Sequence, residues 1–219
     1  MRFRHLLSAA ALALSCTVFA GGASADVDAA KTFVEREHGQ IKKLVDTNAA
    51  PDQVRKAIDN MVDYEQLARR TLGNPCPPTV PSCTNHWDQL KPEQQTEVTD
   101  LLRQLVEKNF HKNLSKTRDY DITYRRALDQ GANVSKIKTE AKSRAEDKKR
   151  EPAVQVDYVI LGMGGDKYRV IDIVTEGSSM TKNYYDQFHR MLTNPSQGYP
   201  YMVQKLQKKI ADKNKDKDK

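Results

Sequence analysis

The spacing of apolar residues changes twice along this chain. Up to about residue 114 they recur every three or four positions, which is typical of helices with one buried face. From about 121 to 175 they alternate with polar residues, as in half-buried strands, and the helical spacing then returns. This order predicts helices over 29–45, 51–62, 63–72, 91–114, 178–192 and 199–211, and strands over 121–128, 132–141, 154–160 and 168–175.

The four predicted strands follow one another, and turns or loops join them. Residues 129–131 separate the first two strands, and residues 162–166 form a hairpin turn between the last two. The glycines of this second turn open no helix, so they do not indicate a phosphate-binding loop. Helices, then consecutive strands, then helices predict an α+β fold with a four-stranded antiparallel sheet wrapped by helices.

The first 25 residues have the features of a secretory signal peptide. Arg2 and Arg4 give a basic start, residues 6–20 are apolar or small, and an Ala-Ser-Ala sequence ends at Ala25. The small residues of this sequence predict cleavage after Ala25, and the apolar run is too short to span a bilayer comfortably. A retained membrane anchor and a lipid on Cys16 are the two alternatives.

The charge of the chain is concentrated at its C-terminus. The formal net charge is +7, and residues 205–219 hold seven lysines against three aspartates. The rest of the exported chain is close to neutral, which argues against a nucleic-acid partner. We expect one domain over 26–212 and a disordered tail over 213–219, which either solvates the C-terminus or is weakly attracted to anionic lipid headgroups.

Two cysteines remain after the signal peptide. Cys76 and Cys83 flank a proline-rich stretch, and two cysteines of an exported chain around such a loop predict a local disulfide. A zinc site is the competing interpretation, but no second Cys or His pair lies near in sequence. The disulfide is therefore favoured, and no metal is expected.

No catalytic motif is present: there is neither a Gly-x-Ser-x-Gly nor a His-Glu-x-x-His sequence. Asp157 and Asp172 lie on neighbouring predicted strands, so a pair of carboxylates is conceivable, although each is more typical of a strand residue hydrogen-bonded at the rim of the sheet. The histidines beyond the signal peptide occupy polar positions that predict surface side chains: His38, His86, His111 and His189.

Several segments, in order, resemble the MlaC (toluene-tolerance) family over about residues 31–210. No single segment is unique to this family, but the order and spacing of all the segments together strongly indicate it. They are VDYEQLARRTLG at 62–73, Trp87 followed by LKPEQQ at 90–95, VQVDY at 154–158, YRVIDIVTEGSSM at 168–180 and YYDQF at 184–188.

The resemblance implies a periplasmic phospholipid carrier with a nuclear-transport-factor-2-like architecture and an interior apolar cavity. Acyl chains would lie inside the protein and the headgroup outside. The implied partners are an outer-membrane lipoprotein–porin complex and an inner-membrane ABC transporter with an MCE-domain subunit. The phospholipid is cargo, and no cofactor and no catalysis are implied.

Two other function classes fit the same fold. One is an enzyme of the hydratase or isomerase type that uses Asp157 or Asp172, since one fold hosts many functions. The other is a secreted adaptor with a filled core and no ligand. For the carrier, the implied fold predicts that one cavity is lined by the following residues: Leu105, Tyr124, Val134, Val156, Tyr158, Ile160, Val170, Val174, Met180, Tyr184 and Phe188.

Overall fold

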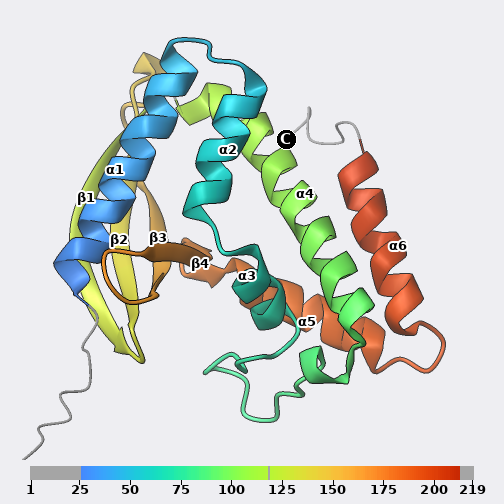
Figure 1. The fold of residues 1–219 in the computed structure, drawn as a ribbon. Helices are drawn as coiled ribbons and strands as arrows, with labels where there is room; N and C mark the ends of the chain where they lie inside the picture. The colour runs from blue at the N-terminus through green and yellow to red at the C-terminus, as the bar shows by residue number, and fades with distance from the viewer. Residues whose placement is uncertain (1–25, 118, 213–219) are drawn as a thin grey trace, which may run out of the picture.

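The fold combines a meandering antiparallel sheet with six α-helices in the described part of the chain (Figure 1). The computed structural model describes residues 26–117 and 119–212, without the side chains of 110–117. The predicted signal peptide and the predicted disordered tail at 213–219 lie outside the described residues. Within the described residues, no helix is both long and apolar enough to cross a bilayer.

Three helices precede the disulfide loop. Helix α1 (Val27–Asp46) begins at Asp26, whose carboxylate accepts hydrogen bonds from the free backbone N–H groups of the first turn. Helices α2 (Pro51–Met61) and α3 (Tyr64–Thr71) are separated by Val62, which leaves the helical conformation and forms a parallel bridge with Val170. Asp63 then caps α3 by accepting from the Gln66 N–H at 2.9 Å.

The sheet has five strands in sequence order, where the sequence predicted four. The strands are β1 (Tyr120–Gly131), β2 (Val134–Ser143), β3 (Val154–Gly162), β4 (Tyr168–Thr175) and β5 (Ser178–Ser179). Glu176 and Gly177 have positive φ values of 50° and 77°, and this tight turn folds β5 back onto β4. A strand of two residues is too short to produce an alternating pattern, so the sequence did not reveal it.

The other helices are α4 (Pro92–Thr117), α5 (Met180–Leu192) and α6 (Gly198–Ala211), with short 3-10 turns at Trp87–Gln89 and Glu146–Lys148. Of these helices, α5 packs against β4, α4 packs against α3, and α6 packs against α4 and α5. The Ser179 hydroxyl caps α5 by accepting from the Lys182 N–H at 3.1 Å. Helix α6 buries three apolar side chains, so it belongs to the folded body.

The described side chains form two hydrophobic clusters rather than one core. The first cluster joins α1 and α2 to the sheet and includes Phe33, Val34, Ile41, Ile58, Met61, Ile137 and Ile160. The second joins helices α3 to α6 and includes Leu67, Trp87, Leu102, Leu105, Phe188, Met202 and Leu206. Val62 packs against both clusters, so the α2–α3 junction is where they meet.

The predicted disulfide joins Cys76 to Cys83 with an S–S distance of 2.12 Å. The loop is fixed to α5, because the Thr84 N–H donates to the Tyr185 hydroxyl at 2.8 Å. Gly73 precedes the loop with φ of +83°, and a Cβ there would lie 2.4 Å from the Thr84 carbonyl oxygen. Only glycine fits this position, because it tolerates both the close approach and the left-handed backbone.

Candidate functional site

A pocket of about 510 Å³ lies between α1, α2, α4 and one face of the sheet. Its deep wall is apolar and comes from the two hydrophobic clusters. Ile41, Ile58, Met61 and Val170 are buried there, and Val106 of α4 completes the wall from the side of the second cluster. Two other hollows, of about 380 and 450 Å³, have mostly polar linings. The apolar pocket is therefore the candidate functional site.

Exposed charged side chains form the rim of the pocket. Glu35 and Lys42 belong to α1, Asp121 belongs to β1, and Arg144 directly follows β2. Arg144 forms an ion pair with Asp121 at 2.5 Å. The rim thus carries both signs of charge, whereas the deep wall carries none.

A third group of lining residues is polar but uncharged. The Nδ1 atom of His38 on α1 lies 2.8 Å from the Tyr124 hydroxyl on β1. The His38 ring also meets the edge of the Tyr158 ring on β3, with 4.7 Å between the centroids. Burial lowers the pKa of His38 to about 4, so the ring is neutral near pH 7.

Burial also raises the pKa of Tyr124 to about 12, with a smaller contribution from the negative charge of Glu35. Burial raises the pKa of Tyr158 as well. Both tyrosines therefore keep their hydroxyl protons at any physiological pH. The three rings form a neutral polar group between the charged rim and the apolar wall.

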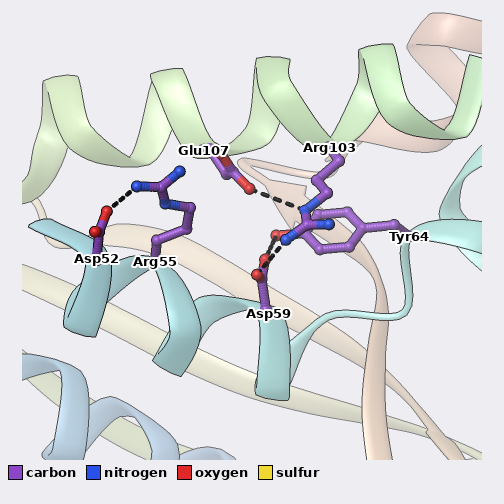
Figure 2. Close-up of polar contacts among 6 residues, drawn as sticks. All are labelled: Asp52, Arg55, Asp59, Tyr64, Arg103 and Glu107. Atoms are coloured by element: carbon purple, nitrogen blue, oxygen red, sulfur yellow. Dashed lines mark hydrogen bonds and ion pairs between the residues drawn. The ribbon is translucent and has the colours of Figure 1, made fainter.

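An ion-pair network joins the two helices that flank the pocket (Figure 2). The Arg103 guanidinium on α4 contacts Asp59 of α2 at 2.5 Å and Glu107 of its own helix at 3.0 Å. The Tyr64 hydroxyl donates to Asp59 at 3.1 Å, and the Tyr64 ring lies 5.7 Å from the guanidinium carbon. We call Asp59, Tyr64, Arg103 and Glu107 the Arg103 cluster.

The structure places three of the predicted cavity residues at this pocket, namely Tyr124, Tyr158 and Val170. Residues paired directly across antiparallel strands share a face of the sheet. Val134 pairs with Leu161 and Val174 pairs with Asp157, whereas Tyr158 pairs with Ile137 and Ile173. Val134 and Val174 therefore lie on the opposite face of the sheet from the pocket.

The remaining predicted residues lie near the pocket face or in the other cluster. Val156 and Ile160 share the face of Tyr158, but they do not line the pocket. The last four pack in the second cluster: Leu105, Met180, Tyr184 and Phe188. The expectation of one cavity placed them wrongly, because helices α3 to α6 build a core of their own.

The histidine prediction also needs correction. His86 is buried, and its Nε2 atom lies 2.9 Å from Nδ1 of His189. His38 lines the pocket, and His111 lies outside the described side chains. Sequence reasoning missed His38 although a signal existed: it falls on the stripe of Val34, Ile41 and Val45 along the buried face of α1.

The two candidate carboxylates point away from the pocket. Asp157 shares its face with Val174, is almost fully buried, and forms an ion pair with Lys136 at 3.3 Å. Asp172 accepts hydrogen bonds from the Ser179 hydroxyl at 2.6 Å and from the Thr181 N–H at 2.9 Å. Asp172 thus fixes the start of α5. In the described residues, no group of three or more His, Cys, Asp or Glu side chains is placed to hold a metal ion.

Comparisons with known proteins identify one family and one solved structure with a similar fold. The family model described as MlaC protein matches residues 28–208. A solved structure with a similar fold is that of a phospholipid-binding protein from Ralstonia solanacearum in complex with a phospholipid. It has a TM-score of 0.64 and 19% sequence identity, and the alignment covers 86% of this chain and 98% of that chain. No curated protein matches the sequence.

Proposed function

Because this chain belongs to the MlaC protein family, we propose that it is an exported phospholipid-binding protein. The acyl chains lie in the apolar pocket, and the headgroup stays at the charged rim. The protein works in the periplasm after loss of residues 1–25. An intact mass that begins at Asp26 is expected for the exported protein.

The observation that carries this proposal is the chemical layering of the pocket. All four charged lining residues are exposed, and the buried lining residues are aliphatic side chains and a methionine, while Ile122 is an exposed apolar residue of the same lining. A phospholipid has the same order of charged and apolar parts. Each methylene group moved from water into such a site gains about 0.8 kcal/mol, so an apolar pocket alone supplies the driving force.

This binding mode supports a carrier role. Acyl chains that leave a membrane need cover from water, and the pocket gives it without a cofactor or a catalytic group. We propose that the chain carries phospholipid between an outer-membrane lipoprotein–porin complex and an inner-membrane ABC transporter with an MCE-domain subunit. The support is family membership and the pocket, and the nuclear-transport-factor-2-like architecture stays a prediction.

The test compares two matched substitutions on opposite faces of the sheet. Ile173→Trp fills the pocket with an apolar side chain, whereas Val134→Trp places the same side chain on the other face. We expect native mass spectrometry of gently purified protein to show bound phospholipid in the wild type and in Val134→Trp. Ile173→Trp should keep its fold, measured by circular dichroism, and lose most of the lipid.

The same experiment separates the alternatives. Wild-type protein without any lipid would contradict the carrier and favour a ligand-free adaptor. A folded Ile173→Trp protein with a normal lipid content would place the acyl chains elsewhere. An enzyme that uses Asp157 or Asp172 has no support from the pocket, because neither carboxylate lines it.

A further inference from the structure

We propose that His38, Tyr124 and Tyr158 form a hydrogen-bonding subsite for the ester carbonyl groups of a diacyl lipid. The inference rests on the proposed function and adds a specificity to it: the pocket recognises the ester linkage as well as the acyl chains. The three residues come from α1, β1 and β3, so only the folded protein brings them together.

The first step is the hydrogen-bonding capacity that these rings leave unused. A neutral imidazole and a phenol carry one donor hydrogen each. The contact between His38 and Tyr124 uses one of these two hydrogens, whichever tautomer is present. One donor of the pair therefore remains for a ligand. Tyr158 contributes a second donor, because its hydroxyl has no hydrogen-bond partner among the residues that the structure describes.

The second step is that an acyl chain cannot use these donors. A hydrocarbon chain has no acceptor, and an unmet polar group in apolar surroundings costs free energy. In ligand pockets, a few polar groups within an apolar lining fix the orientation of the ligand. The donors in this pocket therefore require acceptor atoms on the ligand or water.

The third step is the position of the three rings between rim and wall. All three are half-buried, whereas the charged rim residues Glu35 and Lys42 are exposed and the wall residues are buried. In a diacyl phospholipid, the ester groups likewise lie between the charged headgroup and the chains. With the headgroup at the rim, the two ester carbonyl oxygens reach the level of the rings.

The fourth step is to decide whether these donors bind the ester groups or the phosphate group of the lipid. The His38 ring is neutral, since burial lowers its pKa to about 4, and it offers no positive charge to an anion. The positive charges of the pocket are at the rim, on Lys42 and Arg144. Neutral donors match a neutral carbonyl acceptor, so the phosphate belongs at the rim.

The experiment compares diester and diether forms of phosphatidylethanolamine that have the same chain length. The diether form keeps the headgroup and the chains but lacks both carbonyl oxygens. Delipidated full-length mature protein is titrated with each lipid in competition with a fluorescent phospholipid. The variants are Tyr158→Phe and the double variant His38→Phe/Tyr124→Phe, which removes both donors of the pair. The control is Tyr168→Phe, because Tyr168 is buried in the first cluster and does not line the pocket.

We expect the wild type to prefer the diester by roughly 2- to 10-fold for each carbonyl hydrogen bond. Tyr158→Phe should lose this factor for the diester and bind the diether as tightly as the wild type does. The double variant His38→Phe/Tyr124→Phe should show the same pattern, and Tyr168→Phe should retain the wild-type preference. Circular dichroism of each variant shows whether it is folded.

Equal wild-type affinity for both lipids would overturn the ester subsite and leave phospholipid binding intact. An equal loss of both lipids in folded Tyr158→Phe and His38→Phe/Tyr124→Phe proteins would overturn it too, since the rings would then act by shape alone. Failure of the wild type to bind either lipid would refute the proposed function itself. If one variant does not fold, the other decides.

Discussion

Replacement of Arg103 by glutamine should weaken the contact between the two helices that flank the pocket. The guanidinium is the positive partner of two carboxylates, Asp59 on α2 and Glu107 on α4. Glutamine has a shorter stem and no charge, so it cannot neutralise either carboxylate. Figure 2 shows the Arg103 guanidinium bonded to both carboxylates, and the substitution leaves Asp59 and Glu107 without this shared cation.

The expected size of the effect follows from exposure. The Arg103 side chain is 44% exposed, and Asp59 and Glu107 are 25% and 17% exposed. Exposed pairs contribute about 0.2–1 kcal/mol each, and partial burial of the carboxylates puts both pairs in the upper part of that range. The free energy of unfolding should therefore fall by about 1–2 kcal/mol, which corresponds to a loss of roughly 2–8 °C in Tm for a domain of this size.

The matched control is Arg55→Gln, which removes an ion pair with Asp52 inside α2. These side chains are 45% and 83% exposed, so the loss should stay below about 0.5 kcal/mol. Urea denaturation of both delipidated variants measures the difference, because bound lipid would stabilise the folded state by itself. Equal losses in the two variants would refute the idea that the Arg103 cluster ties α2 to α4.

Three further predictions concern pH, the disulfide and the tail. Burial lowers the pKa of His38 to about 4 from 6.5, so the unfolded state binds more protons below pH 6.5. Unfolding free energy should drop by up to about 3 kcal/mol between pH 6.5 and 4, and urea titrations of His38→Gln should show a flatter profile. The paired Cys76→Ser and Cys83→Ser substitutions open a loop with a sequence separation of 7 and should cost about 2–3 kcal/mol by denaturant unfolding; an unchanged midpoint would contradict this. Deletion of residues 213–219 should leave Tm and bound lipid unchanged and weaken binding to anionic vesicles only at low salt, since salt screens exposed charges. A large loss of Tm would instead make the tail part of the fold.

Local features of the sequence were sufficient to predict most of the elements. Apolar spacing predicted the helices, because a helix that buries one face repeats every three or four residues. Alternation predicted β3 and β4 in the same way, and glycines marked the hairpin turn between them. The pairing of Cys76 with Cys83 needed only an exported chain with two cysteines in one loop. Each of these signals lies within a short stretch of chain.

The site needed information that no local pattern contains. Alternation shows that a strand has two different faces, but not which face meets the helices, so Val134 and Val174 were assigned to the wrong side. No local pattern predicted the division into two hydrophobic clusters. Leu105 and Phe188 belong to the second cluster and therefore do not line the pocket.

What the sequence alone determined is the set of amphipathic elements, their order and the family. The tertiary structure decided which buried faces meet. It placed His38 beside Tyr124, 86 positions along the chain, and Arg103 beside Asp59, 44 positions away. The physical reason is that hydrophobic burial is not directional: it requires that a face be covered but does not specify by which residues. Packing and hydrogen bonding among distant segments make that choice.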